Sequence, residues 1–301
     1  MSMSERWLSE DLSVNQVANC DSFVGVGLPT PWGRLFGGQI LGQAIVAAAR
    51  TVNAKFHVTS VHAYFILAGD SRTEILYEVD RIQEGKSIHR RQVTGKQGGK
   101  VIFIVVAAFQ VEPAGQRLEY TIPIREHIGL MELAEIPRTS GSGYLGLPSA
   151  EELIAQGAKL EVDMITGTVV TVSIYKGERH FLMWRKHREK LPDDSPWSAH
   201  ASIVAFISDQ GPVRMVRQPY EWEPKRMEGR RFGSDASLDH SIHFHRRFRC
   251  DEWHLHVQQT DASFGDRGIA DIRIYARPVD GDDIVLVASC RQEALIRLAK
   301  L

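Results

Sequence analysis

Two stretches of the chain repeat one pattern, and this internal repeat restricts the possible folds more than any other feature. The first, SVHAYFILAGDSRTEILYEVDRIQEGKSIHRRQVTG, begins at Ser60, and the second, SIHFHRRFRCDEWHLHVQQTDASFGDRGIADIRIYA, begins at Ser241. Aligned without gaps, they match Ser60 to Ser241 and His62 to His243. Each copy has three runs of strand-forming residues separated by turn residues. The chain is therefore expected to build one antiparallel unit twice.

Each copy is flanked by one more strand and by one helix-like segment. The additional strands are KVIFIVVAAFQVE from Lys100 and DIVLVASCRQEAL from Asp283. The first helical segment, FGGQILGQAIVAAAR from Phe36 to Arg50, has very small side chains. Glycine inside a helix costs about 1 kcal/mol relative to alanine, so we expect this helix to compensate by packing close to another backbone. The second helical segment includes SIVAFISDQGPV, from Ser202 to Val213.

This order of elements predicts an α+β fold, in which antiparallel strands wrap around one long helix in each unit. We place the first unit at residues 1–112 and the second at residues 160–301, joined by a linker over residues 113–159. The linker contains prolines, the run TSGSGYLG and a short amphipathic piece, SAEELIAQGAK. Exposed sheet edges would allow copies of the chain to associate, so we expect a homo-oligomer.

Composition places the chain among ordinary globular proteins. Hydrophobic residues make up 43% and charged residues 24%, and the formal net charge of -1 gives no electrostatic reason to expect nucleic acid. The three cysteines are scattered and odd in number, which argues against a disulfide framework. Neither a signal peptide nor a membrane span is expected. We therefore predict an intracellular protein, cytoplasmic unless a eukaryotic cell reads the closing Ala299-Lys300-Leu301 as a peroxisomal address.

Asp209 is a single carboxylate at the end of the second helical segment. The C-terminus of a helix already carries negative partial charge, and burial would add a desolvation cost. One interpretation is that Asp209 turns outward into water where the helix ends. The other is that a buried Asp209 has a raised pKa and serves as a base.

Gln292 and Ser237 are the other polar candidates. By alternation, Gln292 lies on one strand face with Ile284, Leu286, Ala288 and Cys290. An amide buried there without a partner would cost about 1–3 kcal/mol, unless the strand frays and exposes it. Ser237 precedes the strand LDHSIHFH, where a hydroxyl also serves commonly as a turn or cap residue.

The remaining sequence patterns give weaker support for a catalytic or metal-binding site. His243-x-His245 and His254-x-His256 are possible metal pairs, but no third ligand accompanies them, so we expect no metal and no cofactor. Asp239-His240 is a poor acid–base dyad, because neighbouring strand residues point to opposite faces. There is no G-x-S-x-G elbow and no P-loop.

Four motifs in order resemble the acyl-CoA thioesterase II family. They are WGRLFGGQILGQAIVAAAR, VHAYFILAGDS, DHSIHFHRRF and SCRQEALIR, and the resemblance runs from Trp32 to Arg297. It implies a double hotdog fold, with two curved antiparallel sheets that each wrap around a central helix. It also implies hydrolysis of acyl-CoA to free acid and coenzyme A without a metal or cofactor. The chain departs from the family at His243 and Arg247, where members carry an aromatic residue and a proline, which concerns the channel lining.

The family's catalytic Asp, Thr or Ser, and Gln carry over onto Asp209, Ser237 and Gln292, all in the second unit. In the implied reaction Asp209 accepts a proton from an attacking water that Ser237 and Gln292 hold. The first helical segment has no acidic residue, so we expect the first unit to be structural. Two alternatives remain: an enoyl-CoA hydratase-like enzyme, whose GDxNPxH-like stretch this chain lacks, and a non-catalytic acyl-CoA binding module.

Overall fold

The computed structural model describes residues 12–17, 20–112, 115, 118–122, 147–165 and 167–299. The strands are β1 (Val14–Gln16), β2 (Ser22–Gly25), β3 (Phe56–Phe65), β4 (Ile75–Glu84), β5 (Ile88–Gln97), β6 (Lys100–Val111), β7 (Glu161–Val162), β8 (Val169–Lys176), β9 (His180–His187), β10 (Phe232–Ser237), β11 (Asp239–Phe244), β12 (His254–Phe264), β13 (Arg267–Ala276) and β14 (Val285–Leu298). The helices are α1 (Gly37–Ala49), α3 (Ala150–Ala155), α4 (Trp197–Ser208), α5 (Pro212–Trp222) and the 3-10 helix η5 (Pro224–Met227).

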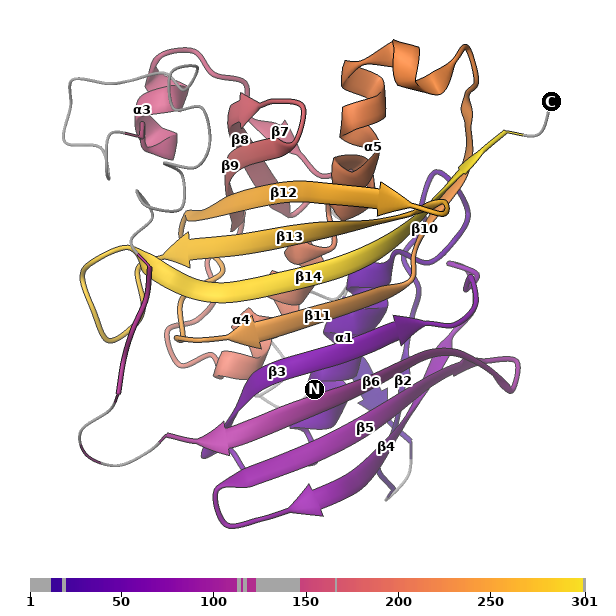
Figure 1. Ribbon diagram of the computed structural model, residues 1–301. Helices are drawn as coiled ribbons and strands as arrows, with labels where there is room; N and C mark the ends of the chain where they lie inside the picture. Colours follow the sequence, from indigo (N-terminus) through magenta and orange to yellow (C-terminus); the bar gives the residue numbers. More distant parts are fainter. Residues whose placement is uncertain are drawn as a thin grey trace.

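The strands form one antiparallel sheet in the order β1-β2-β4-β5-β6-β3-β11-β14-β13-β12-β9-β8-β7, with β10 paired to β14. The two halves of the chain meet where β3 pairs with β11, in a register that places Val61 opposite Ile242. Figure 1 shows the curved sheet in front, with α1 and α4 behind it. Each half therefore has the predicted α+β arrangement. The two sheets also join edge to edge, which the sequence analysis did not predict.

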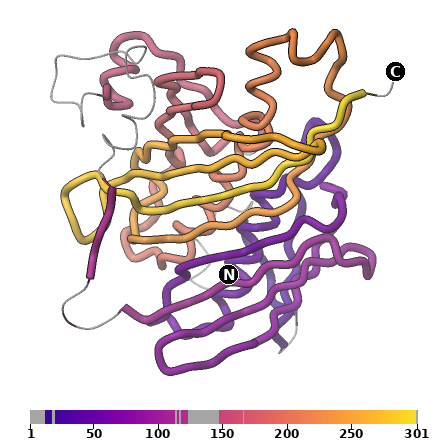
Figure 2. Tube along the Cα trace, in the orientation of Figure 1, coloured from indigo at the N-terminus to yellow at the C-terminus, as the bar shows by residue number. Residues whose placement is uncertain are grey.

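The internal repeat corresponds to matching strands in the two halves. Strands β3 to β6 form the first copy, strands β11 to β14 form the second, and the helices ahead of them are α1 and α4. Figure 2 shows the copies side by side, the first in indigo to magenta and the second in orange to yellow. Strands β8 and β9 and helix α5 were not predicted.

Helices α1 and α4 pack against each other at very short range. A Cβ atom added to Gly38 would lie 2.6 Å from the carbonyl oxygen of Phe206, and one added to Gly42 would lie 2.9 Å from that of Ser202. The glycines are one turn apart on α1 and face residues one turn apart on α4, in the opposite order. The helices are therefore antiparallel, and the predicted close contact of the small-sided helix with another backbone is confirmed.

One hydrophobic core extends through both halves. It includes Leu41 and Ile45 of α1 and Ile203 and Ile207 of α4, all almost completely buried. The indole Nε1 of Trp197, at the start of α4, donates to the carbonyl oxygen of Val58 on β3 at 3.0 Å. The helices of the two halves thus share one interior.

The predictions about the cysteines, membrane spans and the linker can also be compared with the structure. The three cysteines are all free, and none of the described helices is long and apolar enough to cross a membrane. Most of the predicted linker lies outside the described residues, so its boundaries stay a prediction. The amphipathic piece forms α3, which begins with a capping box between Ser149 and Glu152.

We predict that Gly42→Ala destabilises the protein by about 1–3 kcal/mol, because the new methyl group would force α1 away from the backbone of α4. Helix propensity alone predicts the opposite sign, a gain of about 1 kcal/mol. Urea unfolding of the wild type and the variant measures the difference. A variant more stable than the wild type would contradict the close packing.

Candidate active site

Asp209 is buried at the point where α4 ends. It is the C-cap residue of the helix, and only 6% of its surface is exposed. Two residues later, Gly211 adopts a φ of 125°, which favours glycine, and Pro212 begins α5. The carboxylate therefore does not turn outward into water, and the first interpretation of this residue is wrong.

The N-terminus of α1 explains how a carboxylate is tolerated there. Phe36, the N-cap residue of α1, provides no side-chain cap. Instead, the backbone N–H of Gly38 donates a hydrogen bond to the Asp209 carboxylate. The positive end of the α1 dipole thus offsets the negative end of α4. Gly37 has no room for a side chain, since an added Cβ would lie 2.7 Å from Oδ2 of Asp209.

Burial dominates the protonation of this carboxylate and raises the pKa of Asp209 to about 7. Hydrogen bonds from the Gly38 backbone and from the Gln292 and Ser237 side chains act in the opposite direction and stabilise the ionised form. At neutral pH the group therefore exchanges a proton readily, as a general base must.

Ser237 and Gln292 come from neighbouring strands and meet at Asp209. Ser237 is the last residue of β10, and Gln292 lies fully buried on β14. Gln292 Nε2 donates to Ser237 Oγ at 2.7 Å, and Ser237 Oγ lies 3.4 Å from Asp209 Oδ1 in donor geometry. The longer contact is a weak hydrogen bond. The structure brings the three predicted site residues together.

His240 is a fourth member of this network that the sequence analysis did not select. Its Nδ1 makes a very short contact with Gln292 Oε1, and its Nε2 lies 2.9 Å from Ser208 Oγ. Burial lowers the pKa of His240 to about 4, so the ring is neutral at neutral pH. Gln292 Oε1 can only accept, so Nδ1 carries the proton and Nε2 is left as an acceptor. Nε2 faces the Ser208 hydroxyl, which also lies 2.9 Å from the carbonyl oxygen of Ala205. Neighbouring residues of a strand point to opposite faces, so a strand that has Asp239 on its outer face has His240 on its inner face. This alternation is the sequence signal that could have identified His240 as a buried site residue.

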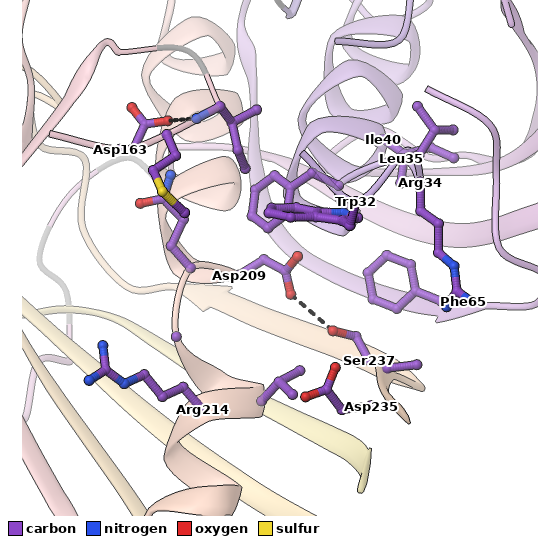
Figure 3. A pocket seen from close by; sticks show the side chains of 18 of the residues that line it. Trp32, Arg34, Leu35, Ile40, Phe65, Asp163, Asp209, Arg214, Asp235 and Ser237 are labelled. Atoms are coloured by element: carbon purple, nitrogen blue, oxygen red, sulfur yellow. Dashed lines mark hydrogen bonds between the residues drawn. The ribbon is translucent and has the colours of Figure 1, made fainter. Parts of the chain in front are cut away.

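A cavity of about 1000 Å³ opens beside Asp209 and Ser237. Figure 3 shows Asp209 pointing toward Ser237, with Trp32, Leu35 and Phe65 on one side and Arg214 on the other. The apolar wall of the cavity includes Trp32, Leu35, Phe36, Ile40, Phe65 and Ile102. Polar and charged residues that also line it include Arg34, Ser173, Arg185, Gln210, Arg214 and Gln258. The cavity therefore combines apolar and polar lining beside the carboxylate.

The described part of the first half has no equivalent of this network. Strand β6 pairs Ala107 with Val61 as β14 pairs Cys290 with Ile242. Two residues further along the buried face, β14 has Gln292, whereas β6 has Phe109, which is 1% exposed. The position that corresponds to the buried amide is therefore Phe109, an apolar residue.

The histidine pairs do not form a metal site. His254 Nδ1 lies 2.8 Å from His256 Nε2, so the two rings bond to each other. His243 instead packs its ring against His62, and His245 Nε2 lies 2.9 Å from Ser289 Oγ. Within the described ranges, no group of three or more His, Cys, Asp or Glu residues is placed to hold a metal ion.

Comparison with known proteins agrees with the resemblance found in the sequence. The family model "Acyl-CoA thioesterase N-terminal domain" matches residues 28–110, and the model "Acyl-CoA thioesterase" matches residues 159–295. Acyl-coenzyme A thioesterase 8 of Mus musculus is 33% identical over 88% of this chain and 81% of its own length. Acyl-CoA thioesterase 2 of Haemophilus influenzae is 29% identical over 89% of each chain.

Solved structures agree as well. Acyl-CoA thioesterase II TesB2 from Mycobacterium marinum superposes with a TM-score of 0.69 at 25% identity, over 97% of both chains. A protein with a hot dog fold from Alicyclobacillus acidocaldarius gives a TM-score of 0.68 at 12% identity, over 97% of this chain and 98% of that chain. The double hotdog prediction is thereby confirmed, and the chain belongs to the acyl-CoA thioesterase II family.

Proposed function

We propose that this protein hydrolyses acyl-CoA thioesters to free acid and coenzyme A in the cavity beside Asp209. The observation that carries this proposal is the buried Asp209 carboxylate, which has a pKa of about 7 and lines a cavity with Ser237. Relatives that match most of the chain are named acyl-CoA thioesterases, which supports the same reaction.

In the proposed reaction a water molecule attacks the thioester carbonyl carbon directly. Asp209 accepts one proton from this water as the carbon–oxygen bond forms. Ser237 and Gln292 orient the water and the carboxylate through their hydrogen bonds. The tetrahedral intermediate then breaks its carbon–sulfur bond, and the departing thiolate of coenzyme A takes the proton from Asp209. A pKa near 7 suits both proton transfers.

The negative charge on the carbonyl oxygen requires donors in place before the reaction begins. The first turn of a helix presents backbone N–H groups that lack partners within the helix. Gly37 opens α1 and lines the cavity next to Asp209. The backbone N–H of Gly38 donates to Asp209, and those of Gln39 and Ile40 donate to the carbonyl oxygen of Phe36. We therefore assign the oxyanion to the backbone N–H of Gly37, where the positive end of the helix dipole adds to the stabilisation.

The two alternative functions fit the site less well. A hydratase would need an Asp and a His that both reach the substrate, but His240 does not line the cavity and its two ring nitrogens are occupied. A module that only binds acyl-CoA has no use for a buried, partly protonated carboxylate at its centre, because an unneeded buried charge is costly.

We expect Asp209→Asn to lower kcat for acyl-CoA hydrolysis by about 100-fold or more, because the amide cannot accept the proton. In the wild type, kcat/KM should rise with pH through the Asp209 pKa of about 7 and level off above it, since the active base is the ionised form. Release of the coenzyme A thiol measures both effects. Equal rates for the two proteins, or a wild-type rate that falls as pH rises from 6 to 8, would remove Asp209 from this role.

We further assign His240 as a positioning residue. Its Nδ1–H fixes the Gln292 amide with Oε1 toward the imidazole and Nε2 toward Ser237 and Asp209. An amide free to rotate would also present its oxygen to Ser237, and in that orientation it would lose its stabilising hydrogen bond to ionised Asp209. His240 therefore acts through Gln292, without touching the substrate.

Two substitutions separate this role from simple packing. The amide nitrogen of Asn lies close to the position of Nδ1, and that of Gln lies close to the position of Nε2. We expect His240→Asn to keep most activity, and His240→Gln to lose about tenfold in kcat and to shift the rising limb of the pH profile upward, because Asp209 loses a hydrogen bond that lowers its pKa.

Thermal unfolding of both variants provides the control for folding. If the two variants lose activity equally and leave the pH profile unshifted, His240 has only a packing role.

Association and location extend this proposal. We infer a homo-oligomer that forms through surfaces other than the edges of β3 and β11, because these two strands pair with each other inside the chain. We also propose that the tripeptide Ala299-Lys300-Leu301 directs the protein to the peroxisome if the source is eukaryotic. Lys300 and Leu301 lie outside the described residues. A yeast relative named peroxisomal acyl-coenzyme A thioester hydrolase 1 is 35% identical over 106 residues, 35% of this chain.

A further inference from the structure

A buried arginine holds the turn that carries Asp209. Arg185 lies on β9, and only 7% of its surface is exposed. Its Nη1 donates to the carbonyl oxygen of Ile207 at 3.1 Å and to that of Gln210 at 2.7 Å. Asp209 lies between these two residues in the chain. One guanidinium nitrogen therefore joins the two ends of the turn from which the Asp209 side chain projects.

Both carbonyl groups belong to the negative end of the α4 dipole. The last carbonyl groups of a helix lack partners within the helix, and their partial negative charge disfavours an ionised carboxylate beside them. The Ile207 carbonyl also accepts from the backbone N–H of Gln210, and the Gln210 carbonyl accepts a weak bond from Gln258 Nε2. Arg185 adds a full positive charge to these neutral donors, and this charge offsets the negative helix end next to Asp209.

The charge of Arg185 is not used in an ion pair within the described part of the chain. Glu161 and Asp163 act on it from a distance, and Glu161 is paired with Lys176 at 3.4 Å. Burial lowers the pKa of Arg185 only to about 10, so the side chain is cationic at neutral pH. A buried cation is costly unless negative charge compensates it. Here the compensation comes from the end of α4, to which ionised Asp209 belongs.

A second buried arginine shows how a helix end is held without this feature. Arg91 on β5 is completely buried, and it donates from Nε to Thr51 Oγ1 at 2.8 Å and from Nη2 to the Thr51 carbonyl oxygen at 3.1 Å. Thr51 follows the C-terminal end of α1, whereas Asp209 contacts the N-terminal end of that helix. Arg91 Nη2 also forms an ion pair with Glu84 at 2.6 Å. A carboxylate therefore compensates Arg91, whereas Arg185 has only the helix end that carries Asp209.

The other titratable and charged groups that face Asp209 or Arg185 do not provide a buried positive charge. Several are exposed, paired with a neighbouring charge or bonded to backbone N–H groups: Arg34, Glu161, Asp163, Lys176, Arg214, Arg217 and Asp235. Three histidines on β11 and β12 are neutral because burial lowers the pKa of each: His240, His254 and His256. Burial raises the pKa of the Cys290 thiol on β14 to about 12, so it is neutral as well. Helix α1 has no charged side chain.

We propose that Arg185 is a positioning residue for the base Asp209, because it fixes the turn from Ile207 to Gln210 and favours the ionised carboxylate. Arg185 acts through the two backbone carbonyl groups, and its described hydrogen bonds do not include the Asp209 carboxylate. This inference rests on the proposed thioesterase function, since it adds a residue to the machinery around the same base.

The test records kcat and KM for acyl-CoA hydrolysis as a function of pH in Arg185 variants. We expect Arg185→Met to lower kcat about tenfold, because the turn is no longer held in place. The rising limb of kcat/KM should also move upward by about one pH unit, since loss of a nearby positive charge raises the pKa of a carboxyl group. KM should change little, because the residue does not act on the substrate.

Two further substitutions separate the charge from the hydrogen bonds. Arg185→Lys keeps a positive charge, so the rising limb should stay near its wild-type position. Arg185→Gln keeps an N–H donor without the charge, so the limb should move as in Arg185→Met, with a smaller loss of kcat at high pH. Because it keeps a donor, Arg185→Gln also provides the result if Arg185→Met does not fold.

Arg91→Gln is the matched control, since it removes a buried cation from a helix end that lies away from the site. Urea unfolding measures the loss of stability in every variant. We expect Arg91→Gln to lose stability as Arg185→Gln does, and to keep the kcat and the pH profile of the wild type.

A rising limb that stays in place in both neutral variants of Arg185, or that moves equally in Arg91→Gln, would overturn this role. A higher KM with an unchanged kcat would also overturn it, because Arg185 would then be a substrate contact. If the wild type hydrolyses no acyl-CoA, the proposed function fails. If the wild type is active and the Arg185 variants keep its kcat and pH profile, only the positioning role fails.

Discussion

The contact between the start of α1 and the end of α4 is the interaction on which the site depends. Gly38 and Gly42 let the two helix backbones approach closely. This approach brings the N–H of Gly38 to the Asp209 carboxylate, so a charge that opposes one helix dipole is stabilised by another. With larger residues on α1 the carboxylate would have neither its burial nor its backbone donor.

This arrangement also explains why the fold needs both copies of its repeat. Asp209, Ser237 and Gln292 all belong to the second half, whereas the helix end that faces Asp209 and much of the apolar wall belong to the first. The first half has Phe109 where the second has Gln292, so it supports one site without forming its own. The pairing of β3 with β11 holds the halves in register.

The sequence predicted the features that depend on local patterns and missed those that depend on distant contacts. Alternation and the repeat identified the strands of both copies, and small side chains identified α1 as a helix that packs closely. The burial of Asp209 was left open, because its backbone donor comes from the other half of the chain. His240 was passed over because its partner Gln292 lies 52 residues away, and only the pairing of β11 with β14 brings them together.

The central claim is that buried Asp209 activates water and does not itself attack the thioester. Many turnovers in oxygen-18 water, followed by mass analysis of the product acid and of the peptide that contains Asp209, test this claim most directly. Direct attack by water predicts label in the acid and none in the Asp209 carboxylate. Label in Asp209, or an acyl group attached to that peptide after rapid quenching, would contradict it.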